Sequence, residues 1–211
     1  MQNKQALEYW QTMAASNPDE KVAKVNPAND YTETDANFIL RYANGNSEIL
    51  DLASGTGLII NRLYDKVSHI DAVELFSDFS KFIKATPRIS VFNQDITQYE
   101  TDKRYDIVTM FGVVSYFNQE EIEKIYCKYF ALIKQGGKLI VKNQFGVKED
   151  VNVSGFSEEL QRNYFSQYRH LDKEIKILEG VGFRNIEVID IYPPECNRWD
   201  NTHFYAIVAE K

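Results

Sequence analysis

From Glu48 onward, short apolar runs alternate with stretches of helical periodicity. The apolar runs are EILDLA, HIDAVEL, ISVFNQ, YDIVTMFGVV, KLIVKNQF, NIEVIDIY and HFYAIVAE. Between them lie helix-like stretches such as LIINRLYDKV, EEIEKIYCKYFALIK and DKEIKILEGVGF. Strands that alternate with helices form βαβ units, in which the strands lie parallel in one sheet. The sequence therefore predicts an α/β fold, and we expect its 211 residues to form a single domain.

Some helix ends are marked by capping residues. Asn118, followed three positions later by Glu121, predicts a capping box at the start of the helix in EEIEKIYCKYFALIK. Gly182 is placed to end the helix in DKEIKILEGVGF. Thr32 is the expected N-cap of an earlier helix near Glu33 to Tyr42.

Two segments stand outside the alternating pattern. Residues 1–45 are predicted to form an N-terminal helical cap, because its apolar residues Ala6, Leu7, Trp10 and Met13 recur at helical spacing. Residues 147–169 form an insertion rich in polar and aromatic side chains. Such insertions serve as lids over bound ligands, so this one is a candidate acceptor lid. The alternative is a surface excursion with a short helix at Ser157 to Asn163.

Composition excludes several classes of partner. The chain has 24 basic and 31 acidic residues, for a net charge of −7, and it has no basic run that could bind a row of phosphates. We therefore expect no nucleic-acid partner. The two cysteines form neither a disulfide framework nor a metal-ligand cluster. No segment has the pattern of a secretion signal or a membrane span, so the expected location is the cytoplasm.

The strongest local signal is the run Ile49-Leu50-Asp51-Leu52-Ala53-Ser54-Gly55-Thr56-Gly57. It reads as an apolar strand that enters a glycine-containing turn and then a helix. Gly55 and Gly57 allow the backbone to turn tightly and to approach a ligand closely. Because open parallel sheets bind ligands at the carboxyl ends of their strands, this turn predicts a nucleotide-like ligand, although a structural turn also uses glycine.

Two further carboxylates indicate which nucleotide is bound. Glu74 ends the second predicted strand, 17 positions after Gly57, where a carboxylate accepts hydrogen bonds from ribose hydroxyls. Asp95 follows the third predicted strand, where it can accept from an adenine amino group. The turn lacks the full phosphate-binding G-x-G-x-x-G pattern, because Ile60 stands at the third position. Carboxylates around a binding site attract a cationic ligand and repel an anionic one, so a cationic ligand is favoured here.

The sequence resembles the class I S-adenosylmethionine-dependent methyltransferases. The matching motifs are ILDLASGTG, VEL, NQDI, YDIVTMFGVVSYF and KQGGKLIV, which cover residues 48–141. Ala53 departs from the pattern, since many members have glycine there. The resemblance implies a Rossmann-like, doubly wound, mostly parallel seven-stranded sheet with helices on both faces. It also implies an antiparallel last strand, which here is HFYAIVAE.

The resemblance also implies roles for individual residues. Asp51 and the turn from Ala53 through Ser54 and Gly55 to Gly57 are expected to hold the methionine end of S-adenosylmethionine. Glu74 is expected on the ribose. The adenine ring and the methyl-donor side are assigned to two further pairs, namely Asp95 with Ile96 and Met110 with Phe111.

The acceptor is predicted to be a small molecule. The loop after the fourth strand, FGVVSY, differs from the pattern of enzymes that methylate amino groups of DNA bases or glutamine. Polar and aromatic residues such as Lys142, Tyr192 and Trp199 suit a hydroxylated acceptor, for example a sugar or nucleotide-sugar. A small amine or a heteroaromatic metabolite is the alternative acceptor. His203 is the candidate general base, and a structural histidine is the alternative.

Two other classes share parts of this pattern. An NAD-dependent oxidoreductase would also use Gly55, Gly57 and Glu74, but it would show the fuller glycine fingerprint. A non-catalytic protein that only binds the cofactor would keep the fold without turnover.

Overall fold

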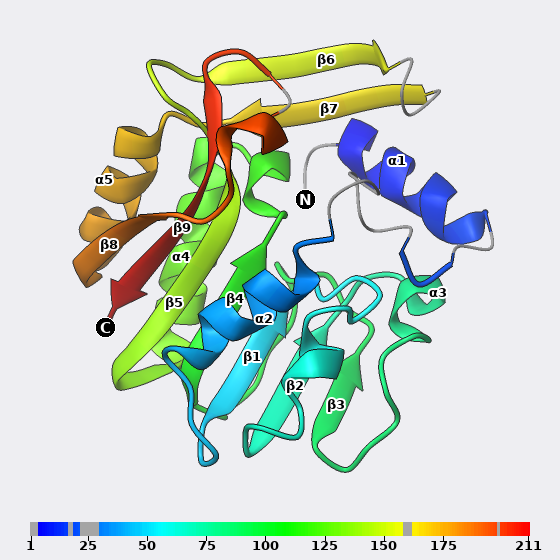
Figure 1. Cartoon of the computed structure of the whole chain (residues 1–211), viewed down its shortest axis with the longest axis vertical. Helices are drawn as coiled ribbons and strands as arrows, with labels where there is room; N and C mark the ends of the chain where they lie inside the picture. The colour runs from blue at the N-terminus through cyan, green and yellow to red at the C-terminus, as the bar shows by residue number, and fades with distance from the viewer. Residues whose placement is uncertain (1–3, 17–18, 22–29, 158–161, 198) are drawn as a thin grey trace.

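The computed structural model describes residues 4–16, 19–21, 30–157, 162–197 and 199–211. Its centre is a seven-stranded sheet in the order β3-β2-β1-β4-β5-β9-β8 (Figure 1). The strands are β1 Glu48–Leu52, β2 His69–Val73, β3 Ile89–Phe92, β4 Tyr105–Phe111, β5 Ile133–Gly146, β8 Arg184–Asp190 and β9 Thr202–Glu210. The pairs among β1 to β5 are parallel, whereas β9 runs antiparallel to both of its neighbours. The predicted mostly parallel sheet with an antiparallel last strand is therefore confirmed.

Helices cover both faces of the sheet. α4 (Gln119–Leu132) and α5 (Leu171–Val181) lie on one face, and α2 (Thr32–Leu40) with the 3-10 turn η1 (Ile60–Arg62) lies on the other (Figure 1). β1 shows why both faces are covered. Its residues are apolar in succession, so Leu50 packs toward α4 whereas Ile49 packs toward α2. Each such fully buried side chain contributes about 1.5–3 kcal/mol.

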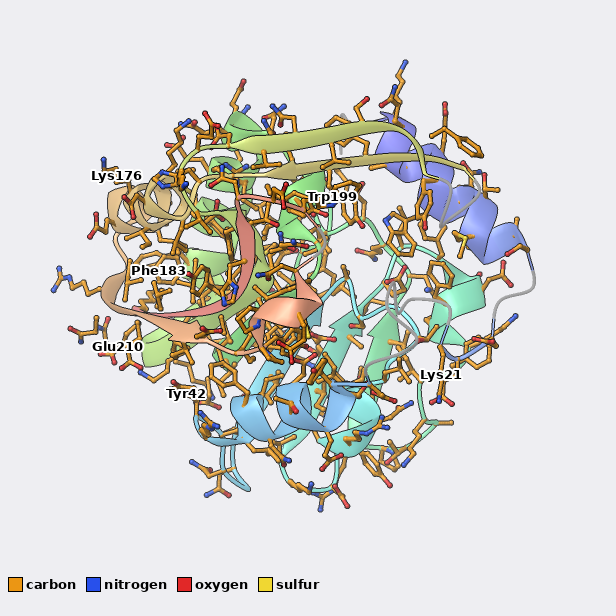
Figure 2. The ribbon with its side chains drawn as sticks, turned by 45° about the horizontal axis from the view of Figure 1, so that its top comes forward. Lys21, Tyr42, Lys176, Phe183, Trp199 and Glu210 are labelled. Carbon is orange, nitrogen blue, oxygen red and sulfur yellow. The ribbon has the colours of Figure 1, made fainter. Side chains whose placement is uncertain are left out.

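Two helix ends form as the sequence predicts. At the start of α4, the Asn118 side chain accepts from the Glu121 amide and the Glu121 carboxylate accepts from the Asn118 amide. At the end of α5, Gly182 adopts a φ of 114°, a conformation that favours glycine. The following residue, Phe183, then packs edge-on against Phe130 of α4, with ring centroids 4.9 Å apart (Figure 2). This contact fixes the junction between α5 and β8.

Two local predictions are wrong. Thr32 does not cap α2, because the cap position is Tyr31 and the Thr32 amide donates to the Asp30 carboxylate. The stretch LIINRLYDKV does not form a full helix but only the short turn η1. Asn61 explains the difference, since its side chain donates to the Phe82 carbonyl and accepts from the Lys84 amide. These bonds join the segment to another loop, so the chain is held by tertiary contacts there.

The insertion at 147–169 contains a β-hairpin outside the main sheet. Its strands are β6 (Val151–Ser157) and β7 (Arg162–Tyr168), and β7 packs against α1 (Lys4–Ala15) (Figure 1). The alternative helix at Ser157 to Asn163 is wrong for Ser157, Arg162 and Asn163, which lie in the two strands. Residues 158–161 lie outside the described part of the chain. The helical nature of residues 4–15 and 32–40 agrees with the prediction for the N-terminal cap. Across the described ranges, no helix has the length and apolar character needed to cross a membrane.

Candidate functional site

A pocket of about 360 Å³ opens beside the carboxyl ends of the parallel strands. The strand ends supply its floor, and α1, α2 and the segment before β9 supply its walls. Most of the predicted cofactor residues meet there, although they come from four strands. The members of that set that line the pocket are Asp51, Ala53, Ser54, Gly55, Glu74, Asp95, Ile96 and Phe111.

The turn after β1 has an unusual backbone. Ala53, Gly55 and Gly57 have φ angles of 60°, 55° and 75°, which place all three in the left-handed region. Only Ala53 carries a side chain that resists this conformation. The Ser54 amide donates to the Val73 carbonyl at 3.1 Å, so the turn is joined to the end of β2. The turn thus presents its backbone to the pocket, as the glycine pattern predicts.

Gly57 serves packing and does not line the pocket. A Cβ atom at this position would lie 2.6 Å from Cγ1 of Ile83. The Thr56 side chain beside it donates to the Glu20 carbonyl at 2.6 Å, which ties the turn to the N-terminal segment. The turn is therefore fixed from both sides.

Three carboxylates stand at the ends of the neighbouring strands β1, β2 and β3. Burial raises the pKa of Asp51 to about 6, although its side chain accepts a hydrogen bond from the Thr109 hydroxyl. Burial also raises the pKa of Glu74, and the nearby Asp51 adds to this effect. Burial of Asp95 acts in the same direction, but hydrogen bonds from the amide and hydroxyl of Thr97 act against it, and the pKa of Asp95 is lowered overall. The first two groups thus favour a ligand that brings positive charge or donors.

Met110 does not line the pocket. It precedes Phe111 on β4, and successive strand residues point to opposite faces. Phe111 turns its ring to the pocket, whereas Met110 is fully buried in the core beneath α4. Met110 therefore supports the floor without forming it.

His203 also lies away from the pocket. Its Nε2 is 2.7 Å from the Asp190 carboxylate, and its Nδ1 is 2.8 Å from the Asn197 side chain. On β9 the next residue, Phe204, lines the pocket, so alternation turns His203 to the other face. Trp199 is 38% exposed in the loop before β9 and is not among the described lining residues (Figure 2). The geometry fits the structural alternative for His203.

The opposite wall carries a buried polar cluster that the sequence analysis did not assemble. Lys142 Nζ lies 2.7 Å from Asp35 Oδ2 and 2.7 Å from the Tyr192 hydroxyl. The Tyr192 hydroxyl in turn donates to Asp35 Oδ1 at 2.6 Å. All three residues line the pocket. Lys142 stands at the end of an apolar strand, which was the one available signal, but the sequence does not show that Asp35 and Tyr192 lie beside it.

Aromatic rings surround this cluster. Tyr31 stacks on Tyr192 with centroids 4.5 Å apart, and its hydroxyl accepts from the Cys196 thiol at 3.3 Å. Trp10 of α1, which also lines the pocket, packs edge-on against Phe79 and Tyr116. The pocket therefore has a carboxylate-lined end and an aromatic end with one buried ion pair.

Comparisons with known proteins agree with this geometry. A family model described as "Methyltransferase domain" matches residues 49–137. No curated protein matches the chain at a significant level. Among solved structures, the complex of DhpI with S-adenosylhomocysteine is 17% identical, with a TM-score of 0.73 over 99% of this chain and 96% of that one.

Two other solved structures show the same fold. An S-adenosylmethionine-dependent methyltransferase from Leishmania major is 17% identical, with a TM-score of 0.76 over 99% of this chain and 82% of that chain. The N-methyltransferase NodS from Bradyrhizobium japonicum, in complex with S-adenosylhomocysteine, is 14% identical, with a TM-score of 0.68 over 95% and 97%.

This chain has both the methyltransferase-domain match and the fold that support S-adenosylmethionine-dependent methyltransferase activity. Its cofactor is S-adenosylmethionine. The family match favours a methyltransferase over an NAD-dependent oxidoreductase.

Proposed function

We propose that the enzyme transfers the methyl group of S-adenosylmethionine to a hydroxyl oxygen of a small molecule, such as a sugar or nucleotide-sugar. The observation that carries this proposal is the division of one pocket into two ends. The carboxylates at the ends of β1, β2 and β3 form a cofactor cradle, and the aromatic end with Lys142 and Asp35 forms a place for an acceptor. The whole chain acts as one domain in this proposal.

The cradle residues have the chemistry that the cofactor needs. Asp51 and the turn at Ala53, Ser54 and Gly55 receive the methionine end, whose ammonium stabilises the buried carboxylate. Glu74 accepts from the ribose hydroxyls. Asp95 and Ile96 bind the adenine, Phe111 borders the methyl donor, and Gly57 with Met110 supports the floor from behind.

The enzyme's task is mainly positioning. The sulfonium methyl is already activated, so the pocket has to hold the acceptor oxygen in line with the S–CH₃ bond and exclude water. Aromatic rings such as Tyr31, Tyr116 and Phe204 supply flat apolar walls for this purpose. Cys127 and Cys196 are unpaired thiols, which is consistent with the cytoplasm as the place of action.

A second candidate is methylation of a small amine or heteroaromatic nitrogen. The Asp35 carboxylate and the stacked rings of Tyr31 and Tyr192 would suit a cationic or aromatic acceptor. NodS, whose fold is similar, is described as an N-methyltransferase. The ammonium of Lys142 stands against this candidate, because it repels a cationic amine at the same wall.

Two measurements test the proposal. Calorimetry should show micromolar or tighter binding of S-adenosylhomocysteine and no comparable binding of NADH. The purified enzyme with deuterated-methyl S-adenosylmethionine should then label compounds in a metabolite extract and in a panel of UDP- and GDP-hexoses. Mass spectrometry should place the label on oxygen. Labelled N-methyl products would favour the amine candidate, and the absence of any labelled product would contradict both.

A further inference from the structure

Lys142, Asp35 and Tyr192 form a closed triangle of hydrogen bonds, hereafter called the triad. Its members come from β5, from the first turn of α2 and from the segment between β8 and η3 (Pro194–Cys196). The side chains of Lys142 and Asp35 are only 12% and 7% exposed. A buried ion pair costs desolvation energy and is weak evidence for stability, so its place in a pocket wall calls for another explanation.

The triad keeps unused hydrogen-bonding capacity on the pocket side. An ammonium group has three N–H donors, and Lys142 uses two of them on Asp35 and Tyr192. Within the described ranges, its third donor has no protein partner. Each oxygen of Asp35 accepts one bond from this triad, and a carboxylate oxygen can accept a second. The wall therefore offers one donor and one acceptor side by side.

The other groups near the triad keep it in this arrangement. The Tyr192 phenol stays protonated, because burial and the neighbouring Asp35 raise its pKa strongly. Its hydroxyl proton is therefore directed at Asp35. The Lys142 ammonium lies over the rings of Phe111 and Tyr192, 5.0 Å and 4.8 Å from their centroids, and Tyr31 stacks behind Tyr192.

We propose that the triad receives the acceptor's reacting hydroxyl group and that Asp35 is its general base. This inference rests on the proposed function. The hydroxyl oxygen accepts from the free N–H of Lys142, and the hydroxyl proton is donated to Asp35. During transfer, the oxygen forms a bond to the methyl carbon while the S–CH₃ bond breaks. The electron pair of that bond stays on sulfur, and the hydroxyl proton passes to the Asp35 carboxylate and afterwards to water.

The same pair of charges selects against ionic groups at this position. A carboxylate or phosphate oxygen that approaches Lys142 also meets the negative charge of Asp35. An ammonium group that approaches Asp35 also meets Lys142, so both kinds of ion are repelled by one partner. A neutral hydroxyl both accepts and donates, and it is the group that satisfies both partners.

The test compares the activity of two triad variants with that of two control variants. The control substitutions lie on the other side of the sheet or outside the pocket. Asp35→Asn keeps the shape of the side chain but removes the base, and Tyr192→Phe removes one of its hydrogen bonds. The control Asp190→Asn alters the carboxylate beside His203, and Lys138→Met removes a lysine of β5 that pairs with Glu210 outside the pocket. The probes are the UDP- and GDP-hexose panel and the metabolite extract, with deuterated-methyl donor.

We expect Asp35→Asn to reduce kcat by at least about 100-fold, which is the usual contribution of a general base. Its affinity for S-adenosylhomocysteine should stay within threefold of wild type, since the cradle is built by other residues. Tyr192→Phe should show a smaller loss of kcat with unchanged cofactor affinity. Both controls should retain wild-type rates, and the wild-type product should be a methyl ether.

Contrary outcomes are distinguishable. Full activity in Asp35→Asn, with an ether product from wild type, overturns the triad assignment but leaves the proposed function intact. An N-methyl or methyl-ester product overturns the hydroxyl assignment. If the wild type binds cofactor and labels nothing, the proposed function fails and the inference fails with it. If Asp35→Asn loses cofactor affinity as strongly as kcat, Asp35 belongs to the cofactor cradle and is not the base.

Discussion

The carboxylate of Glu74 accepts a 2.8 Å hydrogen bond from the backbone amide of Gly55. Its other oxygen accepts from the Phe76 amide at 3.0 Å. The acid after β2 and the glycine turn after β1 are therefore one structural unit, and two backbone amides fix the carboxylate before a ligand arrives. Such pre-organisation lowers the cost of binding, because little freedom is left to lose.

We predict that Glu74→Gln weakens the binding of S-adenosylhomocysteine by about 1.5–3 kcal/mol, because a charge-assisted hydrogen bond to the ribose is replaced by a weaker one. Isothermal titration calorimetry measures the change. Glu100→Gln is the control, since Glu100 is exposed and does not line the pocket. If Glu74→Gln folds and binds with unchanged affinity, Glu74 is not the ribose ligand.

Cofactor binding should depend on pH through Asp51, whose pKa burial raises to about 6. The folded apoprotein therefore binds more protons than the unfolded chain between about pH 4 and pH 6, and the contribution of Asp51 to stability falls as the pH rises through this window. The cofactor ammonium favours the ionised carboxylate. S-adenosylhomocysteine should thus release protons on binding near pH 5.5, and its affinity should rise toward pH 7.

The variant Asp51→Asn separates the proton release by Asp51 from that by Glu74, because the pKa of Glu74 is also raised by burial. The variant should release fewer protons when calorimetry is repeated in buffers of different ionisation enthalpy. At pH 7.5 its apoprotein should be more stable than wild type by roughly 1–3 kcal/mol, because the buried charge of Asp51 is removed. Equal proton release in both proteins would remove Asp51 from the cofactor's charged end.

Gly57→Ala should weaken cofactor binding and lower the melting temperature. The added Cβ would lie 2.6 Å from Cγ1 of Ile83, and the φ of 75° costs an alanine about 1–2 kcal/mol. Gly45→Ala is the control, because nothing lies within 4 Å of a Cβ at that position. Adding Ile83→Ala to Gly57→Ala removes the Cγ1 atom and should restore part of the lost cofactor affinity. Normal binding in Gly57→Ala would show that the turn tolerates a different path.

Ala53→Gly should have the opposite effect. Ala53 has a φ of 60°, a conformation that glycine adopts without strain. The gain of about 1–2 kcal/mol from relieved strain exceeds the 0.4–1 kcal/mol that glycine loses through a freer unfolded chain. Chemical denaturation should therefore show a stability equal to wild type or up to about 1.6 kcal/mol above it. A clear destabilisation would show that the Ala53 methyl group contributes packing that outweighs the strain.

The fold could be predicted because its signals are local, and the same local signals give the turn that is proposed as the cofactor cradle. The alternation of apolar runs gives the strands, the pair Asn118 and Glu121 gives a helix start, and Gly55 comes three residues after the end of β1. The missing helix at LIINRLYDKV has its cause in a long-range contact. Asn61 bonds to a loop 21 residues later, so the expected helix around it is reduced to a turn. No periodicity reports such a contact.

The acceptor end was beyond sequence reasoning for the same reason. Asp35 and Lys142 are 107 positions apart, and each has a simpler local explanation, as a helix-start acid and as a polar strand end. His203 was a plausible base by its position at the start of the last strand. Because successive side chains of β9 point to opposite faces, Phe204 lines the pocket and His203 does not.

The hairpin of β6 and β7 gives the riskiest prediction. Its described residues do not line the pocket, but β7 packs on α1, and Trp10 of α1 does line it. At the foot of the hairpin, Arg169 pairs with Glu174 and donates to the Phe117 carbonyl beside the pocket at 2.9 Å. The hairpin therefore supports the part of the pocket wall that carries Trp10 and Phe117 from outside.

A shortened hairpin tests whether this support matters for turnover. Replacing residues 155–164 by Asn-Gly joins Ser154 to its register partner Phe165 and retains the buried Tyr168 at the base. Because the cradle is built by other strands, affinity for S-adenosylhomocysteine should stay within about tenfold, or about 1.4 kcal/mol. The rate of methyl transfer should fall much further, since α1 loses the strand that holds it. In the wild-type protein, the addition of cofactor and acceptor should slow proteolysis of the hairpin. Equal loss of cofactor binding and methyl transfer would mean that the hairpin supports the cofactor end. If neither is lost, the hairpin is not needed to hold α1, and the contacts with α3 (Ser77–Ser80) and those of Trp10 with Phe79 and Tyr116 are sufficient.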